Sequence, residues 1–181
     1  RLDGGKGNDV MAGDALDSDP SAPSNGANND TLLGGPGDDT LAGLGGNDTL
    51  EGGPGTDQLI GMGGIDTIAG GPGDDTAFGG PLNDAIAGGP DNDTLFGNFG
   101  SDTITGNTAD NKVTGGAGND TIDGLSGSDT AVYSGSSTNY QVTQNANGSW
   151  TVADLRTGSP DGTDTLFNIE WLQFNDGTVA V

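Results

Sequence analysis

The sequence predicts an all-β protein whose chain winds into a parallel solenoid. Three observations lead to this prediction. A nine-residue pattern repeats without a slip from Asn25 to Val132, and one further unit occupies residues 4–12. The sixth position of every unit but one is Asp, and the eighth position is always apolar. A period this strict fixes the architecture before any local propensity is considered.

Each unit divides into a turn and a short strand. In Gly34–Ala42, the first six residues have the Gly-, Pro- and Asp-rich composition of a tight turn with positive-φ positions. The last three, Thr-Leu-Ala, suit a short strand whose middle residue points inward. Two units then make one flat coil, with units two apart on top of one another. Prolines at the third position support this doubling, because they recur in every second unit at Pro36, Pro54, Pro72 and Pro90.

The acidic residues favour a cation-dependent fold. The chain has 37 Gly among 181 residues, 30% hydrophobic residues and a formal charge of −23, values typical of disordered acidic segments. Yet 25 of its 27 acidic residues are Asp, in register with the glycines. Stacked turns bring these carboxylates to the spacing of parallel strands, about 4.8 Å, where they repel. A hard cation, which takes six to eight oxygen ligands, would relieve that repulsion.

The nonapeptide resembles the calcium-binding repeat of RTX (repeats-in-toxin) proteins over residues 4–132. The resemblance implies a right-handed parallel β-roll with two nonapeptides per coil. It also implies Ca²⁺ ligands from the sixth-position carboxylates and from turn carbonyls. The carboxylate ligands expected are Asp9, Asp30, Asp39, Asp48, Asp57, Asp66, Asp75, Asp84, Asp93, Asp102, Asp120 and Asp129. The carbonyl ligands expected are Gly35, Gly37, Gly46, Gly53, Gly55, Gly64, Gly71, Gly73, Gly100 and Gly118.

The number of ions follows from the stacking. Twelve contiguous units give ten next-but-one pairs, so we expect on the order of ten Ca²⁺ ions. Their charge would nearly cancel the formal −23. Asn111 replaces the carboxylate in one unit, and Leu82 and Asp91 replace the fourth-position glycine, which alters the expected fit. The sites that pair Asp93 or Asp129 with Asn111 should be the weakest.

Two regions are expected. Residues 1–132 form the repeats, with a loop insertion at 13–24 whose removal closes the pattern without a phase change. Residues 133–181 hold six of the nine aromatic residues and a hairpin pattern at Tyr140–Thr143 and Trp150–Val152. This segment resembles the cap that closes many RTX rolls, whose last strand edges would otherwise lie open. In that family the extreme C-terminus carries a type I secretion signal, where Thr178–Val181 lies here.

The outward strand positions bear on the choice of partners. Ile60, Phe78 and Phe96 occupy the ninth position of alternate units, so they should stack on one face. We expect an upstream domain of the same protein to cover this apolar ladder. Thr fills the seventh position in nine of thirteen units, which β-propensity explains better than an ice-binding array. The high negative charge argues against nucleic acid and anionic membranes as partners.

Catalysis is not expected of this chain. It has no His and no Cys, which excludes zinc–histidine sites, Ser–His–Asp triads and thiol chemistry within it. Of the two glutamates, Glu51 is an outward strand position and Glu170 belongs to the cap pattern. No hydrophobic stretch reaches membrane-spanning length.

We therefore expect a calcium-binding module of a larger, secreted bacterial protein, which extracellular Ca²⁺ folds after type I export. The chain begins at Arg1 without Met or a signal peptide, so we expect a processed or excised piece. The alternative is an adhesive or polysaccharide-binding module, or, less favoured, an ice-binding β-solenoid.

Overall fold

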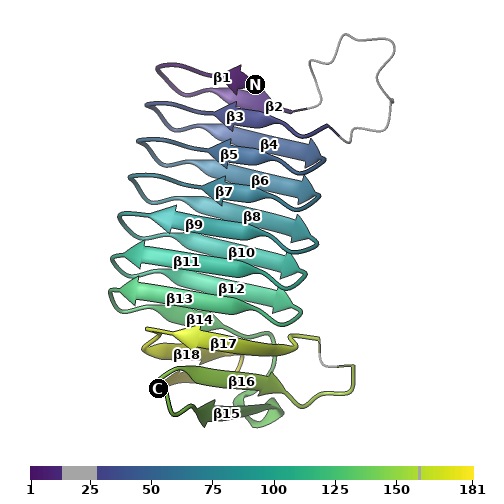
Figure 1. The fold of residues 1–181 in the computed structure, drawn as a ribbon. Coiled ribbons are helices and arrows are strands. Elements are labelled where there is room, and N and C mark those ends of the chain that lie inside the picture. Colours follow the sequence, from purple (N-terminus) through teal and green to yellow (C-terminus); the bar gives the residue numbers. More distant parts are fainter. Residues whose placement is uncertain (14–27, 159) are drawn as a thin grey trace.

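The computed structural model describes residues 1–13, 28–158 and 160–181. Its strands form two sheets that face each other along a solenoid, with the N-terminus at one end and strands β15 to β18 at the other (Figure 1). The predicted all-β parallel solenoid is confirmed.

Within the described residues, sheet A contains ten strands and sheet B contains nine. In spatial order, the strands of sheet A are β1 (Leu2–Asp3), β3 (Thr31–Leu33), β5 (Thr49–Glu51), β7 (Thr67–Ala69), β9 (Ala85–Gly89), β11 (Thr103–Thr108), β13 (Thr121–Ser126), β17 (Thr163–Phe167), β16 (Trp150–Asp154) and β15 (Tyr140–Gln144). Those of sheet B are β2 (Val10–Ala12), β4 (Thr40–Gly45), β6 (Gln58–Gly63), β8 (Thr76–Pro81), β10 (Thr94–Phe99), β12 (Lys112–Ala117), β14 (Thr130–Val132), β18 (Trp171–Phe174) and β19 (Gly177–Ala180).

Strand pairing follows the expected period of two nonapeptides. Leu41 in β4 pairs with Leu59 in β6, and the strands are parallel. At the start of the chain, Met11 pairs with Leu41 across the loop insertion, and both are eighth-position residues. The repeat register is therefore the same on the two sides of the insertion. The residues of the insertion from 14 onward lie outside the described part of the chain.

The core is a single apolar row on each sheet. Every eighth-position side chain from Leu32 to Ala131 is buried between the sheets, and Met11 packs partly buried against them. Burying one Leu or Ile contributes about 1.5–3 kcal/mol. Each coil has only two such residues, so the repeat region must gain stability from its turns as well.

The turns adopt positive φ at their second and fourth positions, whatever residue stands there. Glycine fills most of these positions, and Leu82 and Asp91 keep the same conformation with φ of 79° and 83°. The expected change in turn shape at these two residues is therefore not found in the backbone. A non-glycine residue in this region costs about 1–2 kcal/mol, so the repeat imposes the conformation on them.

The C-terminal strands both extend and close the roll. β17 pairs in parallel with β13, and β18 pairs in parallel with β14, so both continue the two sheets. The predicted hairpin is confirmed: β15 and β16 are antiparallel, and β16 also pairs with β17. The short 3-10 helix η2 (Ser137–Asn139) precedes the hairpin. Tyr133, Tyr140 and Phe174 pack together, with ring centroids 5.1–5.7 Å apart.

The predicted stacking of ninth-position residues on sheet B is also found. Ile60 pairs with Phe78, and Phe78 pairs with Phe96. The two phenyl rings are stacked, with centroids 4.7 Å apart. All three side chains are half-buried rather than fully exposed. Several apolar residues at the ends of sheet B strands and in the turns that follow them are more exposed: Met62 in β6, Phe99 in β10, Ile65 and Leu82.

Candidate cation sites in the turns

The sixth-position residues form a ladder along each side of the roll, and all of them are aspartates except Asn111. From Asp39 to Asp129, each of these carboxylates is at most 3% exposed. One carboxylate oxygen of each residue is tied to the preceding coil. The backbone N–H of Asp39, for example, donates to Oδ1 of Asp57 at 2.7 Å, and that of Asp57 donates to Oδ1 of Asp75 at 2.8 Å.

The second carboxylate oxygen faces the inside of the turn. Among the described residues no hydrogen bond donor reaches it in a set of buried aspartates that spans the roll. These are Asp9, Asp39, Asp57, Asp66, Asp75, Asp84, Asp93, Asp102, Asp120 and Asp129. A buried acceptor without a donor costs about 1–3 kcal/mol, and more when it is charged. A row of such atoms therefore requires a cation or a proton.

Glycine makes room for that cation. A Cβ added to Gly52, at the first turn position, would collide with Oδ2 of Asp57 and lie 2.6 Å from the carbonyl oxygen of Gly70 in the next coil. Gly61 stands in the same relation to Asp66 and Gly79. First-position glycines such as Gly52 and Gly61 thus leave a small space between a carboxylate and a carbonyl oxygen.

The predicted carbonyl ligands lie in the same stacked turns. A Cβ on Gly53 would lie 2.5 Å from the carbonyl oxygen of Gly35, and one on Gly55 would collide with the carbonyl oxygen of Gly37. The inter-coil hydrogen bonds are instead accepted by carbonyl oxygens at the first and third positions. Gly53 N–H donates to Gly70 O and Gly55 N–H donates to Pro72 O, both at 2.9 Å. The glycines named individually from the sequence are at the second and fourth positions, and the first-position carbonyls belong to the same expected set of turn carbonyls.

The donor set fits Ca²⁺. Within the described ranges, no three acidic side chains converge on one point, so carboxylates alone would not make a site. A site built from one or two carboxylates and several carbonyls is the oxygen-only set that Ca²⁺ takes at about 2.3–2.6 Å. A thiol- or imidazole-seeking metal would find no suitable ligand, because the sequence contains neither Cys nor His.

The raised pKa values of the buried aspartates also indicate that the ladder requires a cation or protons. Burial raises the pKa of Asp75, Asp84 and Asp93 to about 7, and neighbouring aspartates add to the shift. Burial likewise raises the pKa of Asp120 to about 6. Backbone N–H donors oppose these shifts without cancelling them. In the absence of a cation, these four aspartates therefore hold protons up to about pH 6–7.

Asn111 carries an amide donor at the position where the other units carry a carboxylate oxygen. Its Oδ1 accepts from the backbone N–H of Asp93 at 2.9 Å, as a carboxylate would. Its Nδ2 takes the place of the second oxygen and donates to the carbonyl oxygen of Ala109 at 3.0 Å and to Oδ1 of Asp129 at 3.1 Å. The amide thus fills the turn with an uncharged hydrogen-bonding group, which is the physical reason to expect a weak cation site there.

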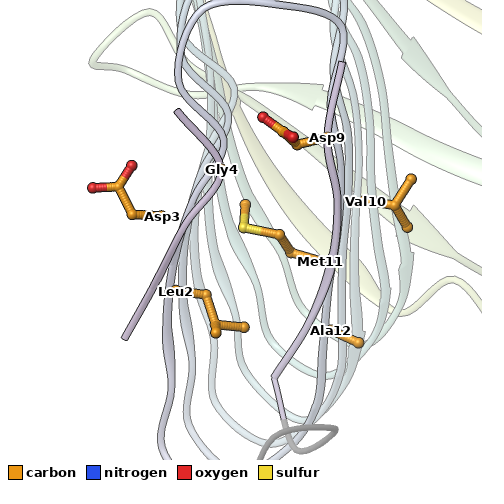
Figure 2. Close-up of a pocket in the computed structure, with 7 residues that line it drawn as sticks. All are labelled: Leu2, Asp3, Gly4, Asp9, Val10, Met11 and Ala12. Carbon is orange, nitrogen blue, oxygen red and sulfur yellow. The ribbon is translucent and has the colours of Figure 1, made fainter. Parts of the chain in front are cut away.

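At the N-terminus, Asp9 and Asp30 extend the two ladders. A Cβ on Gly4 would lie 2.7 Å from Oδ2 of Asp9, and one on Gly13 would lie 2.8 Å from Oδ2 of Asp30. A pocket lined by Leu2, Asp3, Gly4, Asp9, Val10, Met11 and Ala12 opens at this end (Figure 2). Figure 2 shows Met11 pointing between the two strands beside Leu2, while Val10 points away. We interpret the pocket as the open cross-section of the core.

Two further carboxylates belong to the ladders, although the sequence did not identify them as ligands. Asp164 accepts from the backbone N–H of Asp120, and Glu170 accepts from that of Asp129. A signal is present in the sequence, because Asp164-Thr165-Leu166 repeats the sixth to eighth positions of the nonapeptide. It falls out of phase with the repeats, so the pattern alone places it in the cap.

Comparison with known proteins agrees with the pattern of the turns. The family described as RTX calcium-binding nonapeptide repeat (4 copies) matches residues 1–17, 24–59, 51–84, 60–95, 78–108 and 96–131. No curated protein matches the chain. No helix among the described residues has the length and apolar character needed to cross a membrane.

Proposed function

Because the chain belongs to the RTX family of calcium-binding nonapeptide repeats, we propose that its sixth-position aspartates and turn carbonyls bind on the order of ten Ca²⁺ ions. The observation that supports these sites best is the row of buried Oδ2 atoms beside first-position carbonyls. We assign the glycine carbonyls predicted from the sequence to the same sites. Asp48 and Asp30 complete the two ladders.

Calcium binding is proposed to drive folding. The chain carries a formal charge of −23, and each coil buries only two apolar side chains. Without cations, therefore, aspartates that stack in successive coils oppose the folded state. Bound Ca²⁺ supplies the positive charge that the Oδ2 atoms lack, and its binding free energy then becomes folding free energy.

This chain's own residues position the ligands. Each Asp receives a backbone N–H on Oδ1, which fixes the carboxylate and aims Oδ2 into the turn. Positive φ at the second and fourth turn positions orients the carbonyls. Because each carboxylate is held by the coil before it, a site is complete only when two coils have stacked. Binding and stacking are therefore coupled.

The cellular setting follows from this coupling. Repeats of this family are typical of secreted proteins. We propose that the chain is a non-catalytic module of a larger secreted protein. It stays unfolded at low intracellular Ca²⁺, passes through type I secretion machinery, and folds in extracellular Ca²⁺. Sites of extracellular modules bind at about 10⁻⁴–10⁻³ M, which suits this switch.

A calcium titration tests the proposal. We expect the chain in chelator to show a coil-like far-UV circular dichroism spectrum and to gain β-structure cooperatively as Ca²⁺ is added. Mg²⁺ is the control, since it demands octahedral geometry at about 2.0–2.1 Å and should not replace Ca²⁺. A spectrum that is β-rich in chelator, or that Ca²⁺ leaves unchanged, would contradict the proposal and favour a polysaccharide-binding or adhesive module.

We also propose that an upstream domain of the same protein packs on Ile60, Phe78 and Phe96. The support is the stacked Phe78–Phe96 pair and the exposed Phe99 at the end of β10, which is 66% exposed. Comparing hydrogen exchange of β8 and β10 in the chain alone and in a longer form of the protein tests this. Equal exchange in both forms would exclude such a contact.

A further inference from the structure

The cap contains a coil of the roll that is interrupted in sequence. Thr165 in β17 pairs with Thr121, a seventh-position residue, and Leu166 pairs with Ile122, an eighth-position core residue. In the same way, Leu172 in β18 pairs with Ala131, which is also an eighth-position core residue. The backbone N–H of Thr165 donates to Asp120 O at 2.8 Å, as repeat strands do throughout the roll. Residues 163–174 thus supply two more strands in repeat register.

The carboxylates of this coil continue the aspartate ladders. The backbone N–H of Asp102 donates to Oδ1 of Asp120 at 2.8 Å, and that of Asp120 donates in turn to Oδ1 of Asp164 at 2.9 Å. On the other side, the N–H of Asp129 donates to Oε2 of Glu170 at 2.8 Å. Asp164 is 1% exposed, like the ladder aspartates.

The two connections of this coil depart from the regular repeat in opposite ways, since one is longer and the other is shorter. Between β14 and β17 the connection runs from Tyr133 to Gly162 and holds η2 and the β15–β16 hairpin. Between β17 and β18 the turn is shorter, because the seventh-position residues Thr165 and Trp171 are six residues apart where their partners Thr121 and Thr130 are nine apart. Glutamate has one more methylene than aspartate. The longer side chain compensates for the shorter turn and brings its carboxylate to the ladder.

At both places one aspartate keeps a buried carboxylate oxygen without a donor among the described residues, and at Asp129 the space beside that oxygen is preserved as well. Oδ2 of Asp120 and Oδ2 of Asp129 are buried, and within the described structure neither receives a hydrogen bond. A Cβ on Gly124 would collide with both Oδ2 of Asp129 and the carbonyl oxygen of Asn168. The carbonyl oxygen of Asn168 therefore takes the place that a first-position glycine carbonyl has in the regular turns.

We propose that Asp164 and Glu170 are the sixth-position ligands of one further coil, and that divalent cations of the calcium type bind at Asp120–Asp164 and at Asp129–Glu170. The cap is then held to the roll by two ions in addition to its hydrogen bonds and aromatic contacts. This inference rests on the proposed calcium binding and extends it to residues outside the nonapeptide pattern.

The test is the number of Ca²⁺ ions bound per chain, measured by equilibrium dialysis on the full chain. Asp164→Asn and Glu170→Gln should each bind one ion fewer than the unchanged protein, and the double variant two fewer. Both amides can still accept the backbone N–H, as Asn111 does from Asp93. The variants should therefore keep the β-rich spectrum at saturating Ca²⁺. Controls are Glu51→Gln and Asp176→Asn, which remove exposed carboxylates outside the ladders.

A folded variant that keeps its full number of ions would overturn the inference. Should an amide variant fail to fold, Trp150→Phe gives an independent measurement, because it leaves Trp171, next to Glu170, as the sole indole. Tb³⁺ bound at Asp129–Glu170 should then emit on excitation of Trp171. Absence of this emission from the folded, Tb³⁺-loaded chain would also overturn it. If the unchanged chain neither binds Ca²⁺ nor folds with it, the proposed function itself fails.

Discussion

Asn111 donates its side-chain Nδ2 to Oδ1 of Asp129, one coil further along the roll, at 3.1 Å. In the other turns of this ladder the corresponding atom is a carboxylate oxygen that accepts no hydrogen bond from the described residues. One coil interface is therefore held by a neutral amide where its neighbours require a cation.

Converting this residue to the repeat pattern should add a site. Asn111→Asp removes the two amide donations and introduces a second buried oxygen. We expect about one more Ca²⁺ per chain, together with a loss of about 1–3 kcal/mol in the absence of Ca²⁺. Calorimetric stoichiometry and unfolding with and without chelator measure both effects. The control, Asn119→Asp, adds the same charge on the exposed side of a turn and should change neither quantity.

First-position glycines should be intolerant of a side chain. In Gly61→Ala the methyl group would collide with Oδ2 of Asp66 and lie 2.6 Å from the carbonyl oxygen of Gly79. We expect a loss of about 1–3 kcal/mol in the Ca²⁺-loaded state and a higher calcium midpoint. Gly63→Ala is the matched control, because its Cβ meets only Leu44 O at 3.5 Å. Similar midpoints for the two variants would contradict the proposed site geometry.

Calcium affinity should fall as the pH is lowered through 7. Burial raises the pKa of Asp75, Asp84 and Asp93 to about 7, from 3.8 in the unfolded chain, so protons compete with Ca²⁺ below that pH. The calcium-free fold binds more protons than the unfolded chain between these values. The contribution of these three groups to its stability is therefore fully present below pH 4 and is lost as the pH rises through 7. Calcium titrations at pH 5.5 and 7.5 test this, and a midpoint independent of pH would contradict it.

Leu82 should be replaceable by glycine with a gain in stability. Its φ of 79° is in the left-handed region, and its side chain is 56% exposed, so little packing is lost. We expect Leu82→Gly to raise the unfolding free energy of the Ca²⁺-loaded chain by about 1 kcal/mol. Ile65→Gly is the control: Ile65 is similarly exposed at 53% but has no positive φ, so glycine should destabilise there. Thermal unfolding of both variants in excess Ca²⁺ decides the comparison.

The sequence could predict what repeats and could not predict what departs from the period. The constant spacing of Leu41, Leu59 and Ala77 set the register and the core, because a solenoid stacks equal lengths of chain. The places of Asp164 and Glu170 were not predicted, since they lie 44 and 41 residues from their partners rather than one regular coil away. Nor could the pattern indicate that Asn111 fills its turn with its own amide. Such compensation depends on side-chain geometry and not on spacing.

The interrupted coil also has a consequence for the order in which the chain can assemble. A regular coil closes as soon as 18 residues follow its partner, whereas the last one needs 44 residues for Asp120 to meet Asp164. Closing the longer loop costs about 0.8 kcal/mol more in chain entropy. It also requires β18, which begins at Trp171 and lies 40 residues or more beyond its partner β14. A molecule that emerges N-terminus first therefore cannot seal this coil until Asp164, Glu170 and the strands that carry them are free, so arrival of the cap sets the time at which the roll is complete.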